Sequence, residues 1–96
     1  MEIISAQNPK IKYASRLRNR HFRDEQKKTL LEGYRAVRRA CEVGFPMEIC
    51  FYCPELFLGS NEQDLLARLE KAGVSLCRVS QNAFAKLAYR DRPEGL

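Results

Sequence analysis

Hydrophobic and polar positions in the first quarter of the chain predict one helix over 9–22. Asn8 is a favourable N-cap, and a proline at the first helical position loses no intrahelical hydrogen bond. At about 100° per residue, one mainly apolar face of this helix carries Ile11, Ala14, Leu17 and His21. Four basic residues line up on the opposite face, Lys12, Arg16, Arg20 and Arg23. We therefore expect a basic ridge on this helix, with His21 partly buried on the apolar side.

The apolar runs after this helix predict three strand-and-helix pairs. The expected strands span 29–31, 47–53 and 74–79, and the expected helices span 34–43, about 61–72 and 80–88. Gly44 and Gly73 follow two of these helices, at the position where glycine commonly ends a helix. One helix followed by repeated strand-helix pairs predicts an α/β fold with right-handed crossovers, a small three-layer α/β/α domain.

The length of 96 residues allows one domain with one modest core. Hydrophobic residues make up 45% of the chain, but no apolar run approaches the roughly 18 residues of a membrane-spanning helix. The residues after Met1 lack the basic region and the long apolar segment of a secretory signal. We therefore expect a soluble, cytoplasmic protein with no membrane partner.

The four cysteines include a pair, Cys50 and Cys53, with the spacing of a zinc-binding motif. In the expected strand 47–53, residues three apart point to opposite faces of the sheet and cannot share one metal. A redox pair would be expected at a helix N-terminus, whereas Pro54 and an irregular loop follow this pair. We expect free thiols that pack as small hydrophobic residues and no metal site, with a thiol redox protein as the alternative.

Charge is distributed unevenly along the chain, whose net charge is +5. From 8 to 39 there are eleven Lys or Arg and three acidic residues, a local charge of +8, while 40–89 has four basic and six acidic residues, or −2. A basic front half and a near-neutral back half are typical of a protein that binds a polyanion on one side. The alternative is a charged surface that only keeps the protein in solution.

The dipeptide Glu32-Gly33 lies between the expected strand 29–31 and the following helix. In α/β units this junction is a frequent ligand site, because free N–H groups and the positive helix end attract phosphate. Gly33 allows a sharp turn and a close approach by a partner, and Arg35 adds a cation in the first helical turn. Glu32 would orient Arg35 or accept a hydrogen bond from a base or a 2′-hydroxyl. The alternative is a simple turn with an acid at a helix N-terminus.

The C-terminal residues interrupt the strand-helix pattern. A polar segment leads through Pro93 and Gly95 to a final apolar residue, Leu96, as though another strand should begin there. We expect the chain to be part of a longer protein, with a domain over 1–89 and a linker over 90–96.

Several motifs together resemble the N-terminal substrate-binding domain of the SpoU/TrmH family of RNA 2′-O-ribose methyltransferases. They are Asn-Pro-x-Ile-Lys at 8–12, a basic segment ending at 23, Glu-Gly-x-Arg at 32–35 and a helix ended by Gly44. The segment 92–96 is similar to the Pro-x-Gly-apolar junction that precedes the catalytic domain of that family. The resemblance covers essentially the whole chain.

The resemblance implies the α/β fold of the kink-turn-binding large-subunit ribosomal proteins, in a domain that holds structured RNA for a neighbouring catalytic domain. We expect ribosomal RNA, with transfer RNA as the alternative. In the family the neighbouring domain is knotted, dimeric and binds S-adenosylmethionine, so the parent protein is expected to be a homodimer and a methyltransferase. Residues 1–96 contain none of its motifs, and alone they are expected neither to bind a cofactor nor to methylate.

The family motif assigns RNA binding to a first set of residues, Asn8, Lys10, Lys12, Glu32, Gly33 and Arg35. The helical-face argument adds a second set, Arg16, Arg20, Arg23, Arg38 and Arg39. No catalytic or metal-binding residue is expected. An RNA-binding protein of the same fold with no attached enzyme is the alternative function.

Overall fold

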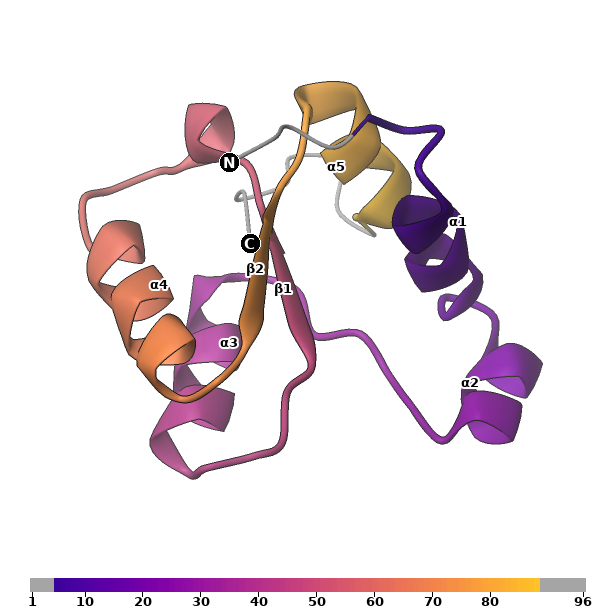
Figure 1. Ribbon diagram of the computed structural model, residues 1–96, viewed down its shortest axis with the longest axis horizontal. Coiled ribbons are helices and arrows are strands. Elements are labelled where there is room, and N and C mark those ends of the chain that lie inside the picture. The colour runs from indigo at the N-terminus through magenta and orange to yellow at the C-terminus, as the bar shows by residue number, and fades with distance from the viewer. Residues whose placement is uncertain (1–4, 89–96) are drawn as a thin grey trace.

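The computed structural model describes residues 5–88, which form five α-helices and a two-stranded parallel sheet (Figure 1). The elements in chain order are α1 Pro9–Arg16, α2 Arg20–Gln26, α3 Tyr34–Glu42, β1 Ile49–Tyr52, the 3₁₀ turn η1 Pro54–Leu56, α4 Glu62–Lys71, β2 Ser75–Arg78 and α5 Gln81–Leu87. None of the helices within 5–88 has both the length and the apolar composition needed to cross a bilayer. The expected linker 90–96 lies outside the described residues.

The parallel strands β1 and β2 form the middle layer, with Ile49 opposite Ser75 and Tyr52 opposite Arg78. Figure 1 shows α3 and α4 on one side of this sheet and α1 and α5 on the other. Helix α4 connects the two strands, as parallel pairing requires a long crossover. The predicted three-layer α/β/α fold is therefore confirmed.

Each face of the sheet has its own hydrophobic cluster, because successive side chains of a strand point to opposite faces. The cluster under α3 and α4 includes Val37, Cys50, Tyr52, Leu65, Leu66 and Leu69. The cluster under α1 and α5 includes Ile11, Ala14, Cys53, Val79, Phe84 and Leu87. The domain thus has two small cores separated by the sheet, in place of the one core that its length predicted.

The helix predicted over 9–22 is wrong in one respect, since the chain forms two helices there, α1 and α2. Asn19 interrupts the helix with an extended backbone, and its side-chain oxygen accepts a hydrogen bond from the Phe22 N–H at 3.1 Å. Asparagine often makes such local bonds in place of helical ones. The Arg23 guanidinium then donates to the carbonyls of Leu17 at 3.1 Å and Arg18 at 2.8 Å, where α1 has ended.

The break in the helix also changes the position of His21. Its side chain is 86% exposed, and Nε2 lies 2.9 Å from Oε1 of Glu25 one turn later in α2. The prediction of partial burial assumed one continuous helix. Because α2 begins afresh at Arg20, residue 21 no longer continues the apolar face of α1.

The strand predicted over 29–31 is also wrong, because the described sheet contains only β1 and β2. Leu30 does pack against the cluster under α1 and α5, whereas Leu31 is 43% exposed. Positive φ values flank the segment, 55° at Lys27 and 101° at Gly33. Hydrophobicity correctly predicted that part of the segment is buried. Hydrophobicity does not determine whether a segment pairs as a strand, because pairing requires backbone hydrogen bonds to β1.

Candidate nucleic-acid interface

The Glu32-Gly33 junction leads directly into the N-terminus of α3. Gly33 is the buried N-cap residue, with φ 101° and ψ 150°, and it makes no side-chain capping bond. This backbone region is essentially restricted to glycine. The first N–H groups of α3 lack intrahelical partners by geometry and carry the positive end of the helix dipole. The junction is therefore suited to an anion, although it follows an irregular segment and not the expected strand.

A cavity of about 700 Å³ opens beside this junction, where the N-termini of α3 and α4 meet. On the α3 side it is lined by residues 32–36, including Arg35, whose side chain is exposed. On the α4 side it is lined by Leu58, Gly59, Asn61 and Glu62. The predicted residues Glu32, Gly33 and Arg35 therefore lie together at one site, beside a second loop that the sequence did not indicate.

Sequence reasoning did not identify Glu62 as a candidate site residue. The residue is 6% exposed, and its Oε2 accepts hydrogen bonds from the N–H groups of Leu58 and Gly59, both at 3.2 Å. Its Oε1 is buried and has no hydrogen-bond partner among the described residues. An acid directly after Gly-Ser-Asn at a helix start was the available signal, since such acids often accept from preceding backbone N–H groups.

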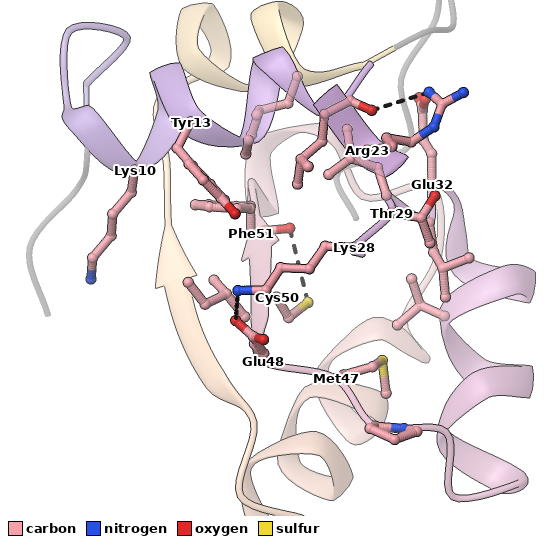
Figure 2. A pocket seen from close by; sticks show the side chains of 18 of the residues that line it. Lys10, Tyr13, Arg23, Lys28, Thr29, Glu32, Met47, Glu48, Cys50 and Phe51 are labelled. Atoms are coloured by element: carbon pink, nitrogen blue, oxygen red, sulfur yellow. Dashed lines mark hydrogen bonds and ion pairs between the residues drawn. The ribbon is translucent and has the colours of Figure 1, made fainter. Parts of the chain in front are cut away.

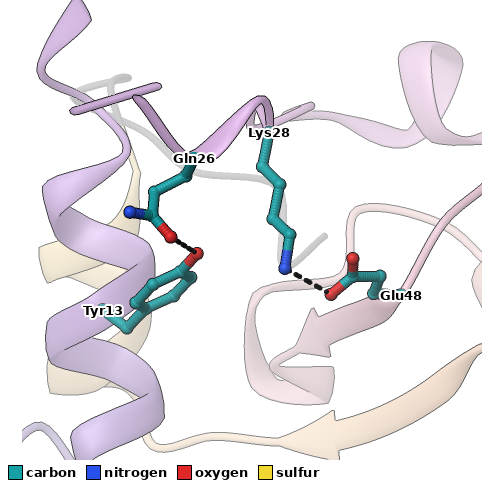
Figure 3. Close-up of polar contacts among 4 residues, drawn as sticks. All are labelled: Tyr13, Gln26, Lys28 and Glu48. Atoms are coloured by element: carbon teal, nitrogen blue, oxygen red, sulfur yellow. Dashed lines mark hydrogen bonds and ion pairs between the residues drawn. The ribbon is translucent and has the colours of Figure 1, made fainter. Parts of the chain in front are cut away.

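A larger cleft of about 950 Å³ lies between α1, α2 and β1 (Figure 2). Three predicted residues line it, Lys10, Arg23 and Glu32, together with two lysines that were not predicted, Lys27 and Lys28. Lys28 donates to Oε2 of Glu48 at 3.1 Å, which ties the segment before Gly33 to the start of β1 (Figure 3). This hydrogen bond raises the pKa of Lys28. The cleft is lined by acids as well as bases, so its preference for an anionic ligand is weaker than that of the junction.

The basic residues of α1 and α2 lie on one layer of the domain. Helix α2 is held against α1 by Tyr13, whose ring contacts Phe22 edge-on with centroids 5.5 Å apart and whose hydroxyl donates to Oε1 of Gln26 at 2.9 Å (Figure 3). The Arg16 guanidinium lies 4.0 Å from the Phe22 ring centroid. Lys12, Arg16 and Arg20 are exposed. The residues of the predicted basic ridge are therefore divided between two helices that aromatic contacts hold together, and Arg23 among them donates to backbone carbonyls.

The basic residues of α3 lie on the other side of the sheet (Figure 1). Arg35, Arg38 and Arg39 are exposed, and the Arg38 guanidinium lies 5.6 Å from the Tyr34 ring centroid. The predicted site residues thus form two groups in different layers, on α1 and α2 and at the start of α3. The sequence pattern, which treated the front half as one unit, did not predict this division.

Asn8 has a structural role that the family motif did not specify. It is half-buried, and its Oδ1 accepts a hydrogen bond from the Lys10 N–H at 2.8 Å at the start of α1. This is an ordinary N-cap. Lys10 and Lys12 follow on exposed positions of the same helix. The RNA-binding role of all three remains a prediction.

The cysteine pair is divided between the two cores. Cys50 packs under α3 and α4, whereas Cys53 packs under α1 and α5, so the prediction that they face opposite sides of the strand is confirmed. Burial raises the pKa of the Cys50 thiol to about 12, with a contribution from Cys77, and it also raises the pKa of Cys53. These shifts disfavour the thiolate that redox chemistry and metal binding need. Among residues 5–88, no three His, Cys, Asp or Glu residues are grouped as metal ligands.

Comparison with known protein families resolves what kind of domain this is. The model of the MRM3-like substrate-binding domain family matches residues 8–96. The chain belongs to this family. The resemblance to the substrate-binding domain of SpoU/TrmH methyltransferases, inferred from the motifs at 8–12 and 32–35, is thereby confirmed. No curated protein sequence matches the chain.

Two crystal structures have the same fold as this MRM3-like domain. One is of an RNA 2′-O ribose methyltransferase, with 36% identity and a TM-score of 0.83, and the match covers 99% of this chain and 35% of that one. The other is of an AdoMet-bound rRNA methyltransferase from Sinorhizobium meliloti, with 21% identity and a TM-score of 0.77, and the match covers 98% of this chain and 34% of that one. The second supports the fold alone. The chain spans about a third of the length of these structures.

Proposed function

We propose that this MRM3-like domain binds structured RNA and positions it for an RNA 2′-O-ribose methyltransferase domain that follows it in a longer parent protein. We propose ribosomal RNA as the substrate and the cytoplasm as the location. The family match and the 36% identity to an RNA 2′-O ribose methyltransferase support this function. The observation that carries it is the junction of Gly33 and Arg35 at the N-terminus of α3, beside a cavity.

At this junction the chain itself would bind and orient the RNA. A phosphate would accept hydrogen bonds from the first N–H groups of α3 and from the Arg35 guanidinium. The absence of a side chain at Gly33 lets the sugar-phosphate backbone approach the peptide closely. Lys12, Arg16 and Arg20 would contact phosphates of a second part of the same RNA, because they lie in the other layer.

The methyl donor belongs to the neighbouring domain in this proposal. The residues that line the two described cavities include acids as well as bases, so their charges do not indicate a site for the sulfonium cation S-adenosylmethionine. No residue among 5–88 is therefore assigned to the cofactor, and the parent protein is proposed to form a homodimer through its catalytic domain.

The proposal is tested by comparing RNA affinity and stability of Arg35→Ala. Binding to fragmented ribosomal RNA should weaken by about tenfold to a hundredfold, because one charge-assisted hydrogen bond of roughly 1.5–3 kcal/mol is lost. The melting temperature should stay the same, since Arg35 is exposed. Arg68→Ala, at an exposed position of α4 outside both cavities, is the matched control and should change neither quantity.

A large loss of melting temperature in Arg35→Ala, with RNA affinity intact, would show that the junction is only a turn. Crosslinking the parent protein to total cellular RNA and sequencing the bound fragments tests the ribosomal assignment separately. Recovery of transfer RNA instead would leave RNA binding standing and change the substrate.

A further inference from the structure

Glu62 is the one buried acid among the described residues, and one of its two carboxylate oxygens has no hydrogen-bond partner there. Oε2 holds the loop before α4 through the N–H groups of Leu58 and Gly59. Oε1 is as deeply buried but accepts no hydrogen bond from any described residue. A buried carboxylate oxygen without a donor is energetically unfavourable, so we expect a water, an ion or a ligand group to supply the donor.

Oε1 is itself inaccessible to solvent, but the position of a Cβ at Gly59 beside it is not occupied by another atom. A Cβ at Gly59 would lie 3.8 Å from Oε1 of Glu62 and would meet no other atom within 4 Å outside its chain neighbours. Gly59 and Glu62 both line the cavity of about 700 Å³ at the N-termini of α3 and α4. Leu58, at the rim of this cavity, is 79% exposed. A planar group would therefore have to displace flanking side chains of the cavity to reach Oε1.

We propose that this cavity binds a single unpaired guanine nucleotide, with Oε1 of Glu62 accepting from the base. This inference rests on the proposed RNA-binding function and adds a base preference to it. Guanine carries two adjacent N–H donors on its Watson–Crick edge, N1–H and the 2-amino group. In each of the other three bases, the Watson–Crick edge places an acceptor atom next to a donor, and the acceptor repels a carboxylate. Sequence-specific RNA recognition usually reads such edges on bases that are not paired.

Arg35 and the start of α3 complete the site. They line the same cavity as Glu62, so a nucleotide whose base binds Glu62 would place its phosphate near the guanidinium and the first N–H groups of α3. A volume of about 700 Å³ is in the range of small-ligand sites and accommodates one nucleotide. An acid for the nucleobase and an arginine for the phosphate distinguish this site from the surface of α1 and α2, where basic residues outnumber acidic ones.

The test uses the 96-residue chain and three mononucleotides in a titration monitored by NMR spectra of the backbone amides. Guanosine 5′-monophosphate should bind about tenfold more tightly than inosine 5′-monophosphate, which lacks only the 2-amino group, and adenosine 5′-monophosphate should bind no better than the inosine nucleotide. The largest shifts should be at Gly33 and Gly59. Equal affinities for the guanosine and inosine nucleotides would overturn the proposal.

Two variants separate recognition from folding. Glu62→Gln keeps an acceptor for Leu58 and Gly59 but presents an amide donor to the base, so the guanine preference should disappear. Gly59→Ala places a methyl group against Oε1 at an ordinary contact distance. It should weaken the binding of guanosine 5′-monophosphate at least tenfold without changing the melting temperature of the protein. Glu70→Gln, at an exposed position of the same helix, is the control and should have no effect. A guanine preference that survives in both cavity variants would contradict the proposal.

The failure of this inference is distinguishable from the failure of the proposed function. If guanosine and inosine nucleotides bind alike while fragmented ribosomal RNA still binds and responds to Arg35→Ala, only the base preference is wrong. If neither ribosomal RNA nor transfer RNA binds, the proposed function fails, and this inference fails with it.

Discussion

Oδ1 of Asn8 accepts a hydrogen bond from the backbone N–H of Lys10 at 2.8 Å, so two residues of the family motif cooperate to begin α1. Replacing Asn8 with alanine removes this cap and should lower the free energy of unfolding by about 1 kcal/mol. Asn8→Ser retains a capping oxygen and should lose only a few tenths of that amount. Urea unfolding of the two variants beside the native chain measures both effects.

The same pair of variants tests whether Asn8 also contacts RNA. If its amide only caps the helix, Asn8→Ser should bind fragmented ribosomal RNA as tightly as the native chain does. A loss of affinity in Asn8→Ser with stability preserved would show a direct contact through the amide group. Equal stability of Asn8→Ala and the native chain would contradict the capping role itself.

Gly33 and Gly44 lie at the two ends of α3, and both have positive φ, 101° and 71°. Asparagine is tolerated in the left-handed helical region that commonly ends a helix, but not in the extended region of positive φ where Gly33 lies at ψ 150°. Gly33→Asn should therefore lower the free energy of unfolding by about 1–3 kcal/mol, and Gly44→Asn should lower it less. Thermal melts of the two variants make the comparison, and equal losses would argue against a special backbone at the junction.

The exposed bases of α1 and α2 should contribute to RNA affinity through phosphate neutralisation. Lys12→Glu combined with Arg20→Glu is the preferred test, because Arg16 also packs on Phe22 and its replacement would disturb the contact between the helices. The double variant should bind every RNA more weakly, and its plot of log affinity against log salt should be shallower by about one to two units.

The control for this prediction reverses two exposed bases of α4, Arg68→Glu with Lys71→Glu. It changes the net charge by the same amount but lies in the near-neutral half of the chain. If both double variants lose affinity equally, RNA binding responds to total charge, and the surface of α1 and α2 has no specific role.

The buried thiol of Cys50 should make stability fall at alkaline pH. Its pKa is raised by burial from 9.0 to about 12, so between these values the unfolded chain releases a proton that the folded chain retains. The stabilisation by the protonated thiol is complete below pH 9 and is lost as pH rises towards 12, by about 1.4 kcal/mol per pH unit. Urea unfolding of the native chain and of Cys50→Ala from pH 8 to 11 isolates this effect, since all other groups are shared.

In Cys50→Ala the fall in stability with pH should be less steep, although its stability at pH 8 is lower because a buried sulfur is removed. Parallel curves for the two proteins would show that Cys50 already ionises in the folded state. The same burial predicts that Cys50 reacts slowly with iodoacetamide at pH 8 until urea unfolds the chain.

The sequence alone determined the features that depend on nearby residues. Helix α3 was predicted over 34–43 and spans Tyr34–Glu42, because its apolar stripe and the following glycine act within a few residues of each other. The same holds for α4, for both strands of the sheet and for the N-cap at Asn8. The opposite orientations of Cys50 and Cys53 followed in the same way from the alternation of side chains along a strand.

Tertiary structure decided the features that depend on which distant segments meet. The segment 29–31 is hydrophobic enough for a strand, yet pairing depends on its alignment with β1, which composition does not encode. The basic front half divides between two layers because the sheet separates α3 from α1 and α2 (Figure 1). The unused oxygen of Glu62 becomes a candidate ligand only because folding buries it beside the cavity next to Arg35. Local patterns fix helices and caps through short-range bonds, whereas a binding site is made by long-range packing that brings two helix N-termini together.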